Sequence, residues 1–244
     1  MIVIIGETHD DILYFDSVLA NKREEMILEK YKVSIGTIFS QDALIAHDVF
    51  SSNLASAILM NICDKYYVDL IISVGRCMAI SKVIKNGDII VSKRVIDANV
   101  DLTMFSSVVT GQIPGFEKDF MVQDDIIGYL SKGLERRISI NYHLATFLSC
   151  SNMSLDMVNH LKNKQEAFSI GGDLAVIDQN SAGVAVVSQL KGVPFISVKV
   201  AENNLAVANN LESYVSVLDK YIDLGKAVIS TINDISRSDI LEED

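Results

Sequence analysis

The sequence predicts an α/β fold, in which short buried strands alternate with amphipathic helices. The first observation behind this prediction is a series of seven short, mainly apolar and β-branched runs along the chain. The second is the helical spacing of apolar residues between and after them. The third is a hydrophobic fraction of 49% with only 2 prolines in 244 residues, which is typical of a chain with a large core.

The predicted strands are apolar at consecutive positions, which is expected of strands buried on both faces of a sheet. In chain order they are Ile2 to Ile5, Tyr31 to Phe39, Asp69 to Val74, Asp88 to Val91, Leu144 to Ser149, Leu174 to Ile177 and Phe195 to Val200.

Two stripes of apolar residues predict helices. The first stripe is formed by Leu54, Ile58, Ile62 and Tyr66 and follows Ser51-Ser52-Asn53, a sequence typical of a helix N-cap. The second runs from Leu211 to Ile232, and Asn209-Asn210 is its predicted cap. No Gly/Ser-rich linker divides the chain, so we expect one domain over residues 1–234 and an acidic tail over 235–244.

The charge balance excludes several classes of partner. Lys and Arg number 21 against 32 Asp and Glu, a formal net charge of −11, so the surface should repel nucleic acids and anionic membranes. No segment approaches the roughly 20 apolar residues of a membrane span. A small neutral or cationic ligand remains possible, and the surplus of apolar residues favours an oligomer contact.

The cysteines and histidines form no recognisable site. Cys63, Cys77 and Cys150 lack the spacing of a disulfide or zinc framework, and they are interpreted as reduced thiols. The N-terminus lacks the features of a signal peptide, so a cytoplasmic location is expected. The four histidines show no metal-binding spacing, and no nucleophile motif occurs. We therefore expect neither a metal ion nor a cofactor.

Polar clusters follow five of the predicted strands, where α/β proteins bind ligands. These clusters are Gly6 to Asp11, Ser73 to Met78, Asn99 to Phe105 with Gly111 to Phe116, Ala175 to Ser181, and Val193 to Asn204. Each also has a purely structural interpretation. Asp10 and Asp11 equally suit the N-terminus of a helix, and Arg76 equally suits an ion pair with a nearby carboxylate.

Taken in this order, the five polar clusters resemble a known family, most strongly in the third. Asp101 to Phe105 and Gly111 to Gly115 are similar to Asp-Val-Thr-x-Phe and Gly-Gln-Leu-Pro-Gly of the bacterial methylthioadenosine/S-adenosylhomocysteine nucleosidases, within the nucleoside phosphorylase family. Lys85 to Ser92 and Gly192 to Phe195 extend the resemblance, which covers about residues 1 to 232. It implies three layers, α/β/α, around a mixed twisted sheet. It also implies a homodimer in which the Gly111 loop lines the neighbour's pocket and the helix from Ser52 faces the partner.

The resemblance also implies site residues for cleavage of an N-glycosidic bond. Asp11 matches the carboxylate that activates water. Asn203 falls where the family has the Asp that protonates the purine, and Glu202 precedes it, so these three are the candidate catalytic residues. The candidate substrate-binding residues are Arg76, Met153, Asp178, Gln179, Asn180, Lys199, Phe105 and Pro114.

Two departures from the family pattern leave three functions open. Asn180 replaces the carboxylate that binds ribose, and Asn203 cannot deliver a proton to the purine, although a one-residue shift of the alignment would place Glu202 there. The first function is hydrolysis of methylthioadenosine- or S-adenosylhomocysteine-type nucleosides by a degenerate site. The second is a phosphorylase that uses Arg76 for phosphate, and the third is an inactive nucleoside-binding homologue. The two amides and Arg76 also predict a pocket less acidic than the family's.

Overall fold

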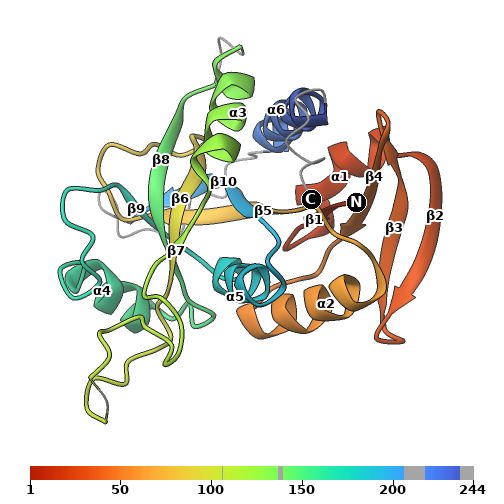
Figure 1. Ribbon diagram of the computed structural model, residues 1–244. Helices are drawn as coiled ribbons and strands as arrows, with labels where there is room; N and C mark the ends of the chain where they lie inside the picture. The colour runs from red at the N-terminus through yellow and green to blue at the C-terminus, as the bar shows by residue number, and fades with distance from the viewer. Residues whose placement is uncertain (106, 137–139, 206–217, 237–244) are drawn as a thin grey trace.

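The protein has a central mixed β-sheet with helices on both faces, as Figure 1 shows for the computed structural model. The structure describes residues 1–105, 107–136, 140–205 and 218–236. One helical layer consists of α1 (His9–Val18), α3 (Asp124–Glu135) and α6 (Leu218–Ser236), and the other of α2 (Ser52–Lys65), α4 (Leu155–Asn163) and α5 (Ser181–Lys191). The predicted three-layer α/β/α architecture is therefore confirmed.

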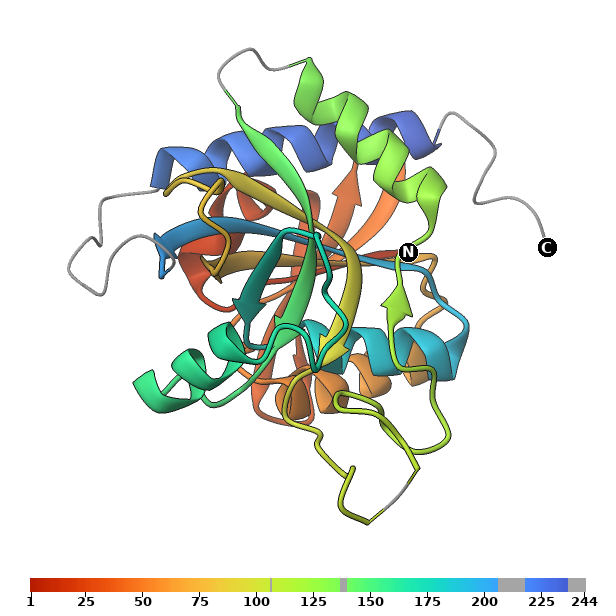
Figure 2. The same cartoon turned by 90° about the vertical axis from the view of Figure 1, so that its left-hand side faces the viewer.

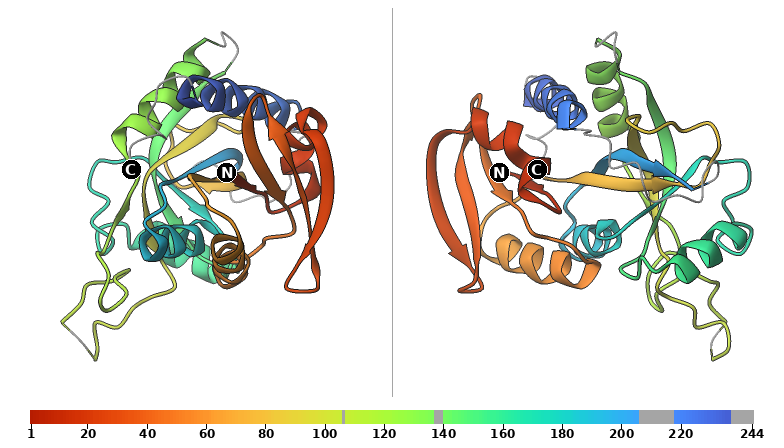
Figure 3. Two further views of the ribbon diagram at one scale, coloured as in Figure 1. Left: turned by 45° about the vertical axis from the view of Figure 1, so that its right-hand side comes forward. Right: turned by 180° about the vertical axis from the view of Figure 1, so that it is seen from behind.

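The sheet closes on itself at one end. Its strand order is β10-β6-β8-β9-β5-β1-β4-β3-β2, and β10 also pairs with β5, so five strands form a ring beside an open extension (Figures 1 and 3). The strands are β1 (Ile2–Ile5), β2 (Ala20–Ile27), β3 (Tyr31–Ile38), β4 (Gln41–Ala46), β5 (Leu70–Ala79), β6 (Ile89–Asp97), β7 (Phe120–Met121), β8 (Tyr142–Ser149), β9 (Ala175–Asp178) and β10 (Phe195–Asn204).

All seven predicted strands are present, but three continue for at least four residues beyond the predicted end. β5 runs to Ala79, β6 to Asp97 and β10 to Asn204. The expectation that the polar cluster Ser73 to Met78 follows the end of its strand is therefore wrong, because the cluster lies within β5. The backbone from Gly75 to Ala79 pairs with β10 and its last two residues pair with β9, and this pairing keeps the polar segment extended.

The strands β2, β4 and β7 were not predicted. β2 has the sequence ANKREEMI and is mostly exposed at the edge of the sheet, where charged residues are favoured and no apolar run marks a strand. β4 and β7 are short, with six and two residues. Their positions follow from pairing with β3 and β6, which a local sequence pattern does not reveal.

The predicted helix after Ser51 is confirmed. Of the predicted C-terminal helix, the part from Leu218 onward is confirmed. The Ser51 hydroxyl accepts a hydrogen bond from the Leu54 amide at 3.3 Å and caps α2. α6 begins at Leu218 in the described chain, whereas Asn209-Asn210 and the first turns predicted from Leu211 lie outside the described residues. The predicted acidic tail also lies outside them from residue 237, so the domain boundary stays a prediction.

The core occupies both faces of the sheet. All four residues of β1 are fully buried, as expected for a strand between two helical layers. Each such aliphatic side chain stabilises the fold by about 1.5–3 kcal/mol on burial. Within the described residues, no helix combines the length and the apolar character needed to cross a membrane.

Candidate active site

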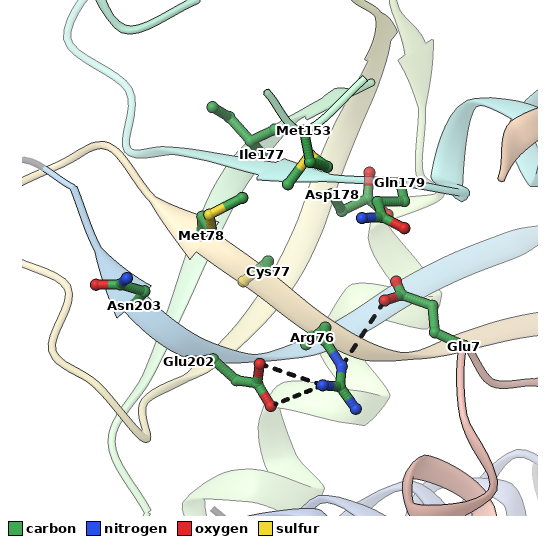
Figure 4. A pocket seen from close by; sticks show the side chains of 10 residues that line it. All are labelled: Glu7, Arg76, Cys77, Met78, Met153, Ile177, Asp178, Gln179, Glu202 and Asn203. Carbon is green, nitrogen blue, oxygen red and sulfur yellow. Dashed lines mark hydrogen bonds and ion pairs between the residues drawn. The ribbon is translucent and has the colours of Figure 1, made fainter. Parts of the chain in front are cut away.

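A cavity of about 250 Å³ lies where β1, β5, β9 and β10 come together (Figure 4). β1, β5 and β10 are parallel neighbours, so their carboxyl ends meet at the same edge of the sheet. The residues that line the cavity are Glu7, Arg76, Cys77, Met78, Met153, Ile177, Asp178, Gln179, Glu202 and Asn203.

The cavity has one apolar and one charged side. Met78, Met153 and Ile177 give the first an apolar character suited to a flat base, and burial raises the pKa of the Cys77 thiol well above its ordinary value. Cys77 is therefore a neutral part of the wall and a poor nucleophile. The charged side is formed by Glu7, Arg76, Asp178 and Glu202.

A bulge in β10 aims two neighbouring side chains in different directions. Ala201 pairs with Cys77 and Asn203 pairs with Met78, so Glu202 is the extra residue of the bulge. The Glu202 carboxylate lies 3.4 Å from Arg76 Nη1 and accepts a hydrogen bond of 3.0 Å from the Tyr221 hydroxyl of α6. Asn203 lies at the opposite side of the lining residues from Glu7, and its amide is turned away from Arg76 and Glu202 (Figure 4).

Arg76 is surrounded by carboxylates. Besides Glu202, its Nη2 lies 3.5 Å from Asp11 Oδ1 and its Nε lies 4.0 Å from Glu7 Oε2. Nη2 also donates a hydrogen bond of 3.1 Å to the Thr8 hydroxyl. The guanidinium therefore neutralises residues of this protein, as the structural interpretation of Arg76 requires.

Lys199 is fully buried beneath the charged side. Its ammonium donates hydrogen bonds of 2.9 Å to Glu7 Oε1 and to Asn180 Oδ1, and it lies 3.7 Å from Asp178 Oδ2. Burial alone would lower the pKa of this lysine, but Glu7 and Asp178 outweigh burial and raise it. Lys199 is therefore charged and holds the carboxylate of Glu7 in place.

Asn180 belongs to the structure behind the cavity wall. Its Oδ1 accepts from Lys199 and from the Ser73 hydroxyl at 3.0 Å, and its Nδ2 donates to the Val49 carbonyl at 2.8 Å. The residue is fully buried and is not among the lining residues. The amide thus links four segments of the chain, and a ribose-binding role for Asn180 stays a prediction.

Asp178 presents an unused acceptor. The Ser181 amide donates to its Oδ2 at 3.1 Å, whereas its Oδ1 has no hydrogen-bond partner among the described residues although it is buried. A buried carboxylate oxygen without a partner is costly. Asp178 also lines the cavity, so its carboxylate is the candidate acceptor for a ligand hydroxyl or amino group.

Glu7 and Asp11 flank the same glycine and are both almost completely buried. A Cβ on Gly75 would lie 3.3 Å from Glu7 Cδ, Asp11 Oδ2 and Lys199 Nζ, so only glycine leaves all three groups room. Glu7 lines the cavity. Asp11 does not, and its Oδ2 accepts from the Thr8 amide at 2.6 Å in the N-terminal cap of α1.

The pKa of Glu7 is raised to about 7. Burial is the largest cause, and the carboxylates of Asp178 and Asp11 add to it, while Lys199 opposes it. Sequence reasoning missed Glu7, although it noted the titratable cluster from Gly6 to Asp11. The signal available was the position of Glu7 directly after a buried strand and a glycine.

The structure thus brings most, but not all, of the predicted site residues together. Arg76, Met153, Asp178, Gln179, Glu202 and Asn203 line the cavity, and Asp11, Asn180 and Lys199 stand behind it. Phe105 and Pro114 are exposed on the loop between β6 and β7, which extends away from the body of the chain (Figures 1 and 2). In the described part of the chain, no cluster of three or more His, Cys, Asp or Glu could hold a metal ion.

Comparison with known proteins identifies the family. The model of the phosphorylase superfamily matches residues 2–232. The chain belongs to the phosphorylase superfamily. The resemblance inferred from Asp101 to Phe105 and from Gly111 to Gly115 is thereby confirmed at the level of the family.

Relatives within the superfamily share the whole fold. A 5′-methylthioadenosine/S-adenosylhomocysteine nucleosidase of Buchnera aphidicola is 27% identical over 208 residues, 82% of this chain and 86% of the relative. An adenine-bound structure from Borrelia burgdorferi, described as a nucleosidase of the same kind, has a TM-score of 0.83 at 22% identity over 96% of this chain and 99% of its own. Futalosine hydrolase of Helicobacter pylori has a TM-score of 0.82 at 15% identity over 96% and 97%.

Proposed function

We propose that this protein hydrolyses the N-glycosidic bond of purine nucleosides of the methylthioadenosine and S-adenosylhomocysteine type. The observation that carries the proposal is the cavity itself, in which an apolar side faces a side bearing Glu7 and the unpartnered Asp178 oxygen. A purine base fits the first, and the hydroxyls of a ribose fit the second. The nucleosidase relative that matches 82% of the chain supports the same substrate class.

The charges of the site favour water over phosphate as the nucleophile. Glu7, Asp11, Asp178 and Glu202 place four carboxylates around the two cations, Arg76 and Lys199. A phosphate anion would have to displace a carboxylate from Arg76 and enter a negative field. This argues against the phosphorylase alternative and against the expectation that Arg76 makes the pocket receptive to anions.

The test is purine release from a panel of nucleosides that differ in their 5′ substituents. We expect release in phosphate-free buffer, with free sugar as the second product and no acceleration by added phosphate. Release that requires phosphate and yields a sugar 1-phosphate would establish the phosphorylase instead. Binding without release would establish the inactive homologue.

Asn203 supplies a second test of the same proposal. Its amide lines the cavity but cannot protonate a leaving purine, and the absence of a positioned acid typically costs 10²- to 10⁴-fold in rate. Asn203→Asp should therefore raise kcat for purine release by tenfold or more. The same change at Asn21, which is exposed on the edge strand β2, serves as the control and should leave the rate unchanged.

We also infer a homodimer in the cytoplasm. Met104 and Phe105 are 86% and 82% exposed on the loop between β6 and β7, which the resemblance places, with Pro114, against the neighbouring subunit. Three unpaired cysteines fit the reducing cytoplasm. Light scattering should give twice 26.8 kDa, and Phe105→Ser should weaken the dimer, whereas Phe39→Ser on the turn after β3 should not. A mass of one subunit would contradict the dimer.

A further inference from the structure

Two carboxylates from the first loop and helix stand beside the cavity, and they are not equivalent. We propose that Glu7, rather than Asp11, is the catalytic carboxylate that takes the proton from the attacking water. This inference rests on the proposed hydrolytic function and deepens it. It assigns the base to a residue that motif matching passes over, one position after Gly6.

The first argument is access. A water that attacks a bound nucleoside must stand in the cavity, and Glu7 is one of the residues that line it. Both side chains are almost completely buried, Glu7 at 2% and Asp11 at 0% exposure, so the two residues differ in the cavity wall, which includes Glu7 but not Asp11. The Oδ2 of Asp11 is held by the Thr8 amide at 2.6 Å, and its Oδ1, which has no hydrogen-bond partner among the described residues, faces Arg76 at 3.5 Å and not the cavity wall. Asp11 is thus a positioning residue for α1 and for Arg76.

The second argument is the way Glu7 is held. Its Oε1 accepts from the Lys199 ammonium at 2.9 Å, which fixes the carboxylate, while its Oε2 lies 4.0 Å from Arg76 Nε, beyond hydrogen-bond length. Arg76 Nε in turn has no hydrogen-bond partner within the described chain. One oxygen of Glu7 is therefore anchored, and the other is available to a water in the cavity.

The third argument is the proton affinity of the group. Burial raises the pKa of Glu7 to about 7, so the carboxylate is present at neutral pH and is a stronger base than an exposed glutamate. A base whose pKa lies near the working pH combines a sufficient ionised fraction with a sufficient drive for proton transfer. The raised pKa agrees with the position of Glu7 in the cavity wall, and it predicts a measurable pH dependence of the rate.

The step balances without any further reactant. The water oxygen forms a bond to C1′ of the sugar, the C1′–N9 bond breaks, and its electron pair remains on the purine. Glu7 takes one proton of the water, and the other stays on the new sugar hydroxyl. The purine takes up a proton from solvent, and Glu7 returns its proton to solvent, which restores the carboxylate.

The experiment is a pH profile of kcat/KM for purine release by the unmodified protein and three variants. For the unmodified protein we expect activity that rises with pH and levels off above about pH 7, because Glu7 must be ionised. Glu7→Gln should lose 10²- to 10⁴-fold in kcat and the rise near pH 7. Asp11→Asn should lower the rate yet keep that rise. Glu24→Gln, on an exposed carboxylate of β2, is the matched control and should change nothing.

The outcomes separate this inference from the function on which it rests. A Glu7→Gln variant that keeps its rate within fivefold, or an Asp11→Asn variant that loses the rise near pH 7, would overturn the role of Glu7 and leave hydrolysis intact. Absence of purine release by the unmodified protein would overturn the proposed function, and the role of Glu7 with it. If Glu7→Gln does not fold, the profile of the unmodified protein decides, since a rise centred below pH 5 would exclude Glu7.

Discussion

At the scale of single residues, the site is a set of buried charges that hold one another. Lys199 connects Glu7, Asn180 and Asp178 behind the cavity, and Arg76 connects Glu7, Asp11 and Glu202 at its side. Removal of one partner from such a set leaves an uncompensated buried charge. Asn180, which the resemblance aligns with a carboxylate, shares its lysine partner with the carboxylate of Glu7.

Arg76 should tune the proton affinity of Glu7. Arg76→Gln removes a positive charge about 4 Å from the Glu7 carboxylate, and a nearby opposite charge lowers the pKa of an acid by about 1–3 units. We therefore expect the rise of kcat/KM with pH to move upward by about one unit in this variant. Arg94→Gln is the matched control, because Arg94 pairs with Asp119 and Asp173 elsewhere, and should leave the rise in place. A shift to lower pH in Arg76→Gln would contradict this electrostatic description.

The sequence allowed many of these residues to be predicted but not their arrangement. Arg76, Asp178, Glu202 and Asn203 follow from polar residues at strand ends and from the resemblance, and all line the cavity. That Glu7 and not Asp11 lines the cavity could not be predicted. Both carboxylates are buried, and only the structure shows that Glu7 lines the cavity while Asp11 is held by the Thr8 amide in the α1 cap.

At the scale of elements, β5 is the main support of the site. It pairs with β1, β9 and β10 and carries Arg76, Cys77 and Met78 into the cavity wall. The sequence predicts that this strand ends at Val74, because glycine and arginine interrupt the apolar run. Pairing on both sides of the strand prevails over that local preference, and the same effect extends β10 to Asn204.

Gly75 should resist substitution. Its φ of +139° is rarely adopted by residues with a side chain, and a Cβ would stand 3.3 Å from three charged groups. Gly75→Ala should lower the free energy of unfolding by about 1–3 kcal/mol in urea denaturation. Gly128→Ala within α3, where a Cβ meets nothing within 4 Å, should instead raise it by about 0.5–1 kcal/mol. Equal stability of Gly75→Ala and the parent would contradict the constraint on β5.

At the scale of the whole molecule, the exterior and the site carry the same sign of charge. The net charge is −11, and four carboxylates surround two cations at the cavity. The overall field therefore disfavours an anionic co-substrate before it reaches the site. The family fold was predictable from motifs spread over the chain. The sign of the charge around the cavity, in contrast, depends on side-chain positions that only the structure gives.

The melting temperature with and without ligands should show that the site prefers an uncharged ligand to phosphate. A ligand at one hundred times its Kd stabilises the folded state by about 2.7 kcal/mol, so adenine at saturation should raise the melting temperature by several degrees. Phosphate should give no more than chloride at the same ionic strength, since the cations are already engaged. A rise in melting temperature with phosphate that Arg76→Gln abolishes would contradict this expectation.

The source of the oxygen atom that the sugar gains tests hydrolysis most directly. A single turnover with methylthioadenosine is carried out in water enriched in ¹⁸O, with phosphate present, and the sugar product is analysed by mass spectrometry at once. We predict a free sugar that carries one ¹⁸O at C1 and no sugar phosphate. A sugar 1-phosphate, or a free sugar without the label, would contradict water activation in this cavity.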